Sequence, residues 1–179
     1  MIPTNRTLIF FGALLFTLSQ AQAQDLPVFS NSDQFSAAQV GQQERKLSTF
    51  MMLVALSGLG TSTELSAPHT LFIPTNDAMD QMPQEQYLYL IYPNNRKALI
   101  DFVNFHYLPT VMSVTDLGRE EEVLTKNGKT LPVTQSDAGN SPRFGGATII
   151  ASDIEANDGI IHVVDRVLTP NNGWSFTDR

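Results

Sequence analysis

Histidine is the side chain best suited to act as a general base near neutral pH, and this chain has few of them. They are His69, His106 and His162. A serine hydrolase would need one of them beside an activated serine, yet the sequence has no Gly-x-Ser-x-Gly turn. We therefore predict no catalytic residues. We expect His106, near a helix end, and His162, in a strand, to be held by hydrogen bonds instead.

Residues 159–170 (GIIHVVDRVLTP) place a histidine and an aspartate in an otherwise apolar strand pattern. Successive side chains of a strand point to opposite faces, so His162 and Asp165, three positions apart, are expected on different sides of the sheet. This separation argues against a catalytic pair. Gly159 is expected to permit a turn with positive φ before the strand, and Pro170 to end the segment. The polar residues are interpreted as anchors of a closing strand.

Acidic residues between Asp153 and Gly159 resemble a calcium-binding loop. That loop needs Gly at position six and Glu at position twelve, where this chain has Asp158 and Val164. A polar turn is predicted instead. The glycines of residues 144–147 (FGGA) lack a phosphate-loop Lys and are predicted to mark a bulge or a close backbone approach. With no cysteine and no zinc motif, we predict neither a metal site nor a cofactor.

The first 23 residues have the pattern of a signal peptide. Arg6 precedes an apolar run over residues 7–18, and Ala21-Gln22-Ala23 is a small-x-small cleavage pattern. The run is short for a membrane span, although an uncleaved anchor is the alternative. No later stretch is predicted to span a bilayer. We expect an exported protein that is periplasmic, attached to the cell surface or secreted.

The charge balance limits the classes of partner. The chain has 179 residues, with 18 acidic and 11 basic side chains and a net charge of −7. Nucleic acids and anionic membranes both require a clustered basic face, so neither is a predicted partner. Hydrophobic residues make up 42% of the chain, which is sufficient for one globular core.

The periodicity of apolar residues divides the exported chain into helices followed by strands. Residues 24–43 are polar and predicted to form a leader with one short helix; residues 44–170 form the domain, and residues 171–179 a tail. Helices are predicted over residues 44–59, 75–82, 83–92 and 96–107. Strands are predicted over residues 70–73, 111–113, 123–125, 130–135, 144–152 and 160–168. The fold class is therefore α+β, with N-terminal helices packed on a mixed or antiparallel sheet wedge.

Local turn chemistry supports this division. Asn127-Gly128 is a strong hairpin signal between two of the strands. Thr75 or Asn76 is expected to cap the helix that follows Pro74. Residues 136–142 are predicted to form a further turn.

Three segments, in order along the chain, resemble the signature of the fasciclin domain. The first is residues 70–76 (TLFIPTN); the second is residues 105–109 (FHYLP), with Phe105 where the family has Tyr; the third is residues 158–165 (DGIIHVVD), followed by residues 168–170 (LTP). The resemblance covers residues 44–170.

The resemblance implies an extracellular adhesion module that contacts a cell-surface or matrix protein or a polysaccharide. Because one domain alone binds weakly, weak self-association is also expected. A small-ligand role, with a lipid or glycan in a groove, and an unrecognised hydrolase are the alternatives. The motif residues are assigned a structural or partner-binding role: Thr70, Phe72, Pro74, Thr75, Asn76, Phe105, His106, Pro109, Gly159, His162, Asp165 and Pro170.

Overall fold

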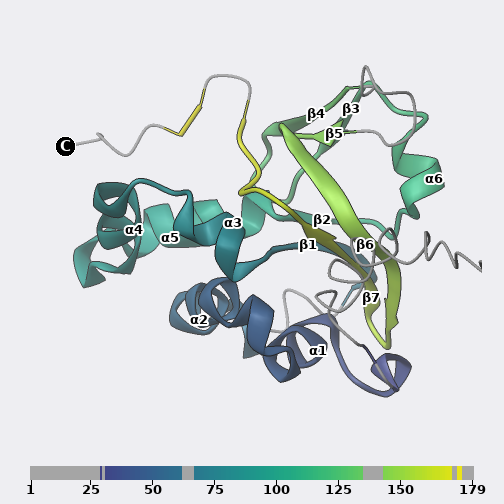
Figure 1. Cartoon of the computed structure of the whole chain (residues 1–179), viewed down its shortest axis with the longest axis horizontal. Coiled ribbons are helices and arrows are strands. Elements are labelled where there is room, and N and C mark those ends of the chain that lie inside the picture. Colours follow the sequence, from purple (N-terminus) through teal and green to yellow (C-terminus); the bar gives the residue numbers. More distant parts are fainter. Residues whose placement is uncertain (1–28, 30, 62–66, 135–142, 171–172, 175–179) are drawn as a thin grey trace, which may run out of the picture.

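One mixed sheet of seven strands organises the fold, in the order β2-β1-β7-β6-β5-β4-β3 (Figure 1). The computed structural model describes residues 29, 31–61, 67–134, 143–170 and 173–174. The expected signal peptide and the turn at residues 136–142 lie outside them. β1 and β7 pair in parallel, and the other neighbouring strands pair antiparallel. The strands are β1 His69–Pro74, β2 Tyr107–Leu108, β3 Glu122–Leu124, β4 Thr130–Thr134, β5 Arg143–Phe144, β6 Ala147–Ala156 and β7 Gly159–Val164.

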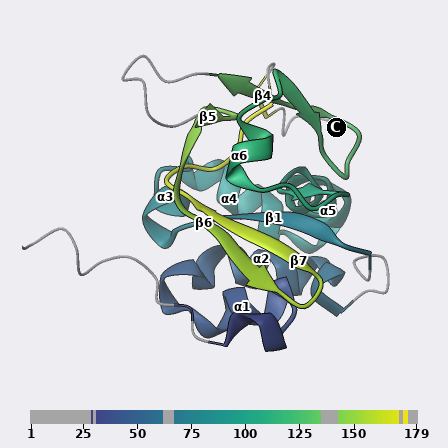
Figure 2. The same cartoon turned by 90° about the vertical axis from the view of Figure 1, so that its right-hand side faces the viewer.

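Helices surround the central strands, as an α+β fold requires. α1 and α2 lie on one side of the central strands, while β3–β5 and α6 lie on the other (Figure 2). The α-helices are α1 Ala37–Gln43, α2 Ser48–Ser57, α3 Asn76–Asp80, α4 Gln84–Ile91, α5 Arg96–Phe105 and α6 Val114–Leu117. In the described part of the chain, 3₁₀ turns precede or connect these elements: η1 Ser32–Gln34, η2 Arg45–Leu47, η3 Leu59–Thr61 and η5 Pro93–Asn95. Within the described ranges, no helix has both the length and the apolar character that crossing a bilayer requires.

The first helix belongs to the packed structure. Ser36 and Gln39 form a capping box at its start, and Ala37, Ala38 and Val40 are buried. This helix lies within residues 24–43, which the sequence analysis treated as a polar leader. The packed structure therefore starts before residue 44.

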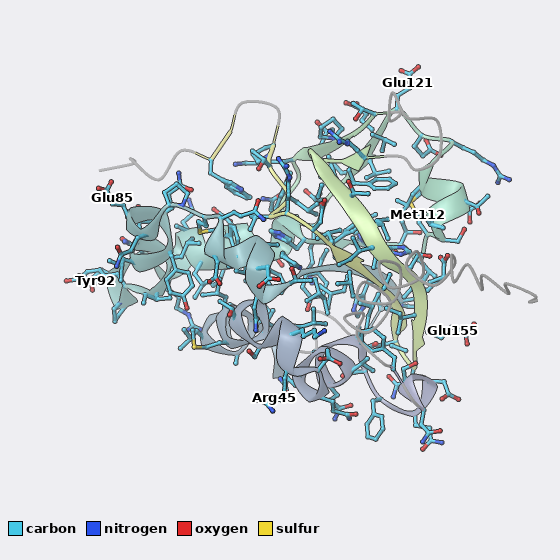
Figure 3. The ribbon with its side chains drawn as sticks, viewed as in Figure 1. Arg45, Glu85, Tyr92, Met112, Glu121 and Glu155 are labelled. Atoms are coloured by element: carbon cyan, nitrogen blue, oxygen red, sulfur yellow. The ribbon has the colours of Figure 1, made fainter. Side chains whose placement is uncertain are left out.

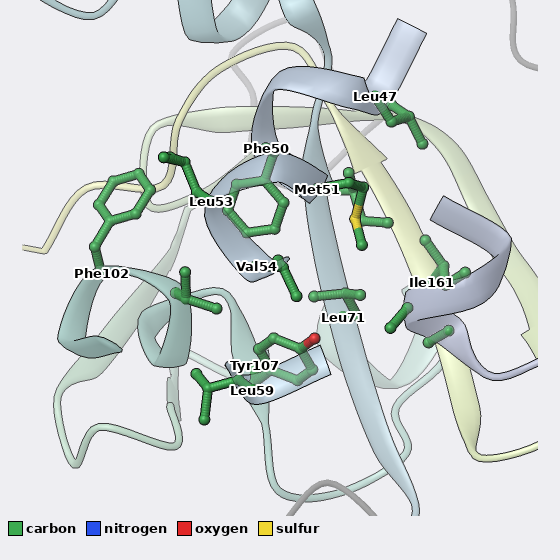
Figure 4. Close-up of a cluster of buried hydrophobic side chains, with 14 of the residues drawn as sticks. Leu47, Phe50, Met51, Leu53, Val54, Leu59, Leu71, Phe102, Tyr107 and Ile161 are labelled. Atoms are coloured by element: carbon green, nitrogen blue, oxygen red, sulfur yellow. The ribbon is translucent and has the colours of Figure 1, made fainter. Parts of the chain in front are cut away.

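β1 and most of β7 are buried and separate two hydrophobic clusters. Leu71, Ile73, Ile161 and Val163 face a cluster built with α1, α2 and α5 (Figure 4). Phe72 faces a second cluster with residues of β4–β6. A central strand buried on both faces has no polar alternation, which is why residues 71–73 form a continuous apolar run.

Several predicted boundaries are wrong. α5 ends at Phe105, and Tyr107 lies in β2, so Pro109 follows a strand rather than a helix. Residues 111–113 are not a strand. The predicted strand over residues 144–152 is two strands joined by Gly145 and Gly146, which have positive φ and form the turn between β5 and β6.

β6 and β7 also differ from the prediction. β6 continues to Ala156 through the predicted polar turn, and β7 stops at Val164, one residue before Asp165. The hairpin at Asn127-Gly128 between β3 and β4 is confirmed. Two apolar residues that share the helical spacing of buried neighbours are on the surface: Leu56 is 48% exposed and Leu88 is 51% exposed.

Candidate functional site

The three fasciclin-like segments meet in adjacent strands. Leu71 of β1 pairs with Tyr107 of β2, and Phe72 of β1 pairs with His162 of β7. Residues separated widely in the sequence therefore form one continuous patch, β2-β1-β7, at the centre of the fold. Thr70 and His162, together with His106 directly before β2, are buried there.

Thr70 and His162 hold one peptide segment from two sides. The Thr70 hydroxyl donates to the Thr110 carbonyl at 2.8 Å and accepts from the Met112 N–H at 2.9 Å. His162 Nε2–H donates to the Met112 carbonyl at 3.0 Å. We call this arrangement the Met112 clamp: the Thr70 and His162 side chains on the backbone of Met112. Because side chains satisfy these backbone groups, residues 111–113 need no partner strand.

The bonds of His162 fix its protonation. Its Nδ1 accepts from the Asp153 N–H at 3.2 Å, while Nε2 carries the proton given to Met112. The ring is therefore the neutral Nε2–H tautomer. Burial lowers the pKa of His162, and the Met112 carbonyl and the Asp153 carboxylate oppose this effect more weakly.

Asp153 extends this arrangement to α6. It lies at an irregularity of β6, where the register shifts between Ala151 and Ile154, and its φ is 54°. Its carboxylate accepts from the N–H of Val114, the first residue of α6, at 2.9 Å. The roles of Asp153 and Met112 could not be predicted from the sequence, since a bulge and a backbone acceptor leave no side-chain pattern.

His106 is also buried and neutral, in the other tautomer. Its Nδ1–H donates to the Phe102 carbonyl at 3.0 Å, and its Nε2 accepts from the Leu168 N–H at 3.3 Å. The rings of Phe50 and Phe102 lie 4.8 and 4.9 Å from its centroid. Burial in this aromatic setting lowers the pKa of His106 to about 4, against a smaller opposing effect of the Phe102 carbonyl.

The two histidines are thus arranged for structure. Each uses both ring nitrogens in hydrogen bonds to backbone, so neither presents a free acceptor to a substrate. His69 is buried as well, and its Nδ1–H donates to the Ala67 carbonyl at 3.0 Å. Within the described ranges, no three His, Asp or Glu side chains are grouped in a way that could hold a metal ion.

Asp165 lies beyond the end of β7, so the predicted alternation of faces with His162 does not apply to it. Its carboxylate accepts from the Thr148 N–H at 2.7 Å, and its own N–H donates to the Thr148 carbonyl at 3.1 Å. These bonds join the end of β7 to β6.

Gly159 opens β7 rather than forming a turn. A Cβ at this position would collide with the His69 backbone carbonyl, so the glycine is required by close approach. Next to it, the Asp158 carboxylate accepts from the N–H of Ala37, the first residue of α1, at 2.7 Å.

Of the two predicted caps, Thr75 is the N-cap of α3, since its hydroxyl accepts from the Ala78 N–H at 3.1 Å. Asn76 instead bonds the start of the neighbouring helix: its Oδ1 accepts from the Thr49 N–H at 3.0 Å, and its Nδ2 donates to the Arg45 carbonyl at 3.0 Å.

The remaining motif residues fill space or end elements. Phe72 packs 5.9 Å from the Phe144 ring and 5.4 Å from the His162 ring, and Pro74 ends β1. Phe105 meets Trp174 edge-on at 5.1 Å. Pro170 is buried, while Pro109 is exposed.

A shallow cavity of about 170 Å³ lies away from these residues. Met82, Val167 and Trp174 give it apolar walls, and Gln86 and Arg166 add polar groups. The Trp174 indole N–H donates to the Leu168 carbonyl at 3.0 Å, and the Lys129 ammonium lies 5.1 Å from its ring centroid.

Comparison with known proteins agrees with this geometry. A family model described as the fasciclin domain matches residues 45–170. Protein sll1483 of Synechocystis sp. is 29% identical over 123 residues, which cover 69% of this chain and 67% of that protein. Transforming growth factor-beta-induced protein ig-h3 of Sus scrofa is 31% identical over 135 residues. That match covers 75% of this chain but 19% of ig-h3.

A solved structure shares the fold. It is the FAS1 domain pair of the insect cell adhesion molecule Fasciclin I, with a TM-score of 0.56 and 16% sequence identity. The match covers 78% of this chain and 52% of that one. The chain thus spans about half of a structure that contains two such domains.

Proposed function

Since the chain belongs to the fasciclin domain family, we propose that it is an exported, non-catalytic binding module of the cell envelope. Its partner is a cell-surface or matrix protein or a polysaccharide. Its relatives include ig-h3, periostin and the cell adhesion molecule Fasciclin I. The signal-peptide pattern of residues 1–23 supports export, to the periplasm, the cell surface or the medium.

One observation carries the non-catalytic part of the proposal. In His106 and His162 both ring nitrogens form hydrogen bonds to backbone groups. These motif side chains therefore join strands and loops instead of acting on a substrate. The clamp also presents an exposed surface. Pro109, Thr110 and Val111 precede the fixed peptide of Met112 and are exposed.

The proposal is tested by retention of residues 24–179 on intact cells and on envelope or matrix extracts. Retention is expected for the wild type and weaker retention for Val111→Asp, since Val111 is 43% exposed on the clamped segment. Ile150→Asp, at an apolar β6 position that is 37% exposed, is the matched control and should bind like the wild type. No retention on any extract would refute the adhesion role.

The cavity beside Trp174 gives the small-ligand alternative a specific location. A thermal-shift screen against glycans, lipids and metal ions separates the two functions, because a ligand that binds only the folded state raises its melting temperature. A shift that disappears in Arg166→Ala would favour a small ligand. No shift together with retention on cells would favour adhesion.

A further inference from the structure

Four large apolar side chains are exposed on two neighbouring helical segments. Met52 and Leu56, one turn apart on α2, are 45% and 48% exposed. Leu88 and Tyr92, one turn apart at the end of α4, are 51% and 56% exposed. Residues with this spacing lie on the same helix face. An isolated exposed apolar residue needs no explanation, but two stripes of this kind do.

The start of α5 links the end of α4 to the end of α2. The Arg96 guanidinium donates to the Leu56 carbonyl at 3.4 Å and to the Ser57 carbonyl at 3.0 Å, so α5 begins where α2 ends. Tyr92 precedes Arg96 across the short η5 turn, and Lys97 follows it on the surface. We call Met52, Leu56, Leu88, Tyr92, Arg96 and Lys97 the helix corner.

The helix corner is cationic in a chain with an acidic excess. α2 has no charged residue, and Arg96 and Lys97 supply two positive charges. The helices α4 and α5 each carry one carboxylate: Glu85 is in the first turn of α4, at the end opposite Tyr92 (Figure 3), and Asp101 of α5 is half-buried one turn after Lys97.

An acidic surface of matching character lies on the other side of the molecule. Glu120, Glu121 and Glu122 are exposed, and Leu124 beside them is 58% exposed on β3, an edge strand. We call these four residues the strand corner. Figure 3 shows Glu121 far from Tyr92, across the molecule. Arg119 does not cancel this charge, since it pairs with Asp116 at 3.0 Å.

We propose that copies of this chain associate head to tail, with the helix corner of one copy on the strand corner of the next. Each corner combines exposed apolar surface with charge, and the two charges are opposite, which favours contact between unlike corners. A symmetric dimer through either corner would place like charges together. A net charge of −7 also opposes contacts that do not use a cationic surface.

A head-to-tail contact leaves one corner free at each end, so further copies can be added, to an open chain or to a ring where the rotation between copies closes. This association needs only the chain itself and does not depend on the adhesion partner proposed above. In chains of this kind several weak binding modules would act together, which raises avidity without new contacts.

Sedimentation of purified residues 24–179 tests the proposal. At low ionic strength, about 20 mM, the weight-average mass should rise with concentration, and it should return to that of the monomer at about 500 mM salt, where charges are screened. Leu88→Glu with Lys97→Glu should abolish the rise, as should Glu121→Lys with Glu122→Lys. These residues are exposed, so both variants should keep the wild-type melting temperature.

Mixing the two variants provides the decisive measurement. Each has one original and one reversed corner, and the original strand corner of the helix-corner variant can bind the original helix corner of the strand-corner variant in the wild-type contact. The mixture should therefore associate, although neither variant does so alone. A monomeric wild type, a variant that still associates, or a mixture that stays monomeric would overturn the proposal. So would binding of the monomeric wild type, but not the helix-corner variant, to vesicles containing anionic phosphatidylglycerol.

Discussion

Acidification should destabilise the fold through His106. In the unfolded chain its pKa is near the ordinary value of 6.5, whereas burial in the folded protein lowers it to about 4. Protonation is therefore favoured in the unfolded state, so stability is complete above pH 6.5 and is lost as the pH falls toward 4. At pH 5 the expected loss is about 2 kcal/mol, and at pH 4 about 3 kcal/mol. His162, whose pKa is also lowered, adds to the loss in the same direction.

Urea unfolding followed by circular dichroism between pH 7.5 and pH 5 measures this loss, since most carboxylates titrate at lower pH. His106→Phe and His106→Gln are the matched variants. Both remove the titrating group, but one keeps the aromatic ring and the other keeps amide hydrogen bonding. Each should be less stable than the wild type at pH 7.5, by about 1–3 kcal/mol for each backbone group left unsatisfied. Their stability should depend less on pH.

The shape of the pH dependence decides the result. If both variants lose as much free energy of unfolding between pH 7.5 and pH 5 as the wild type does, His106 is not held neutral by burial and the reasoning is refuted. Substituting His162 as well, in the His106→Phe background, should further reduce the dependence of the free energy of unfolding on pH.

Three further substitutions test individual contacts. In denaturant titrations, Gly159→Ala should lower the free energy of unfolding by more than about 2 kcal/mol, because the new Cβ would collide with the His69 backbone. Gly128→Ala is the control: its Cβ would enter open space, so only the φ of 79° is unfavourable, and the free energy of unfolding should fall by about 1 kcal/mol. Thr75→Ala should cost about 1 kcal/mol by the same measurement and Thr75→Ser much less, since serine also caps a helix; equal costs would contradict the cap. Thr70→Val should speed hydrogen exchange at the Met112 amide while Thr70→Ser preserves protection, and unchanged exchange in Thr70→Val would contradict the clamp.

Much of the fold could be predicted from local patterns. The α+β class, the hairpin at Asn127-Gly128 and a cap at Thr75 depend on residues close in sequence, and these predictions are confirmed. Predictions of where helices and strands end failed where contacts between residues far apart in the sequence decide the boundary. Residues 111–113 have a strand-like composition, but the backbone N–H and carbonyl of Met112 form hydrogen bonds with the Thr70 and His162 side chains instead of with a strand.

The expectation that apolar helix faces are buried failed at two positions for a related reason. Helical periodicity assigns Leu56 and Leu88 to apolar faces, and both lie on such faces, but no other element covers them. The hydrogen-bond partners of His162 could not be predicted either, because a backbone carbonyl and a backbone N–H leave no pattern in the sequence. Its burial and structural role could be predicted, whereas the contact with Met112 could not.

The parallel pairing of β1 with β7 has a consequence for the order of events during synthesis. His69 lies opposite Gly159, so 159 − 69 = 90 residues separate the first partners of this ladder. Pairs so distant in sequence form slowly, and here the central strand has no partner on that side until the last strand has been made. A chain still emerging from the ribosome thus remains without its completed sheet, a state suited to the export that we propose. The strand that closes the fold also sets the earliest moment at which the protein can fold.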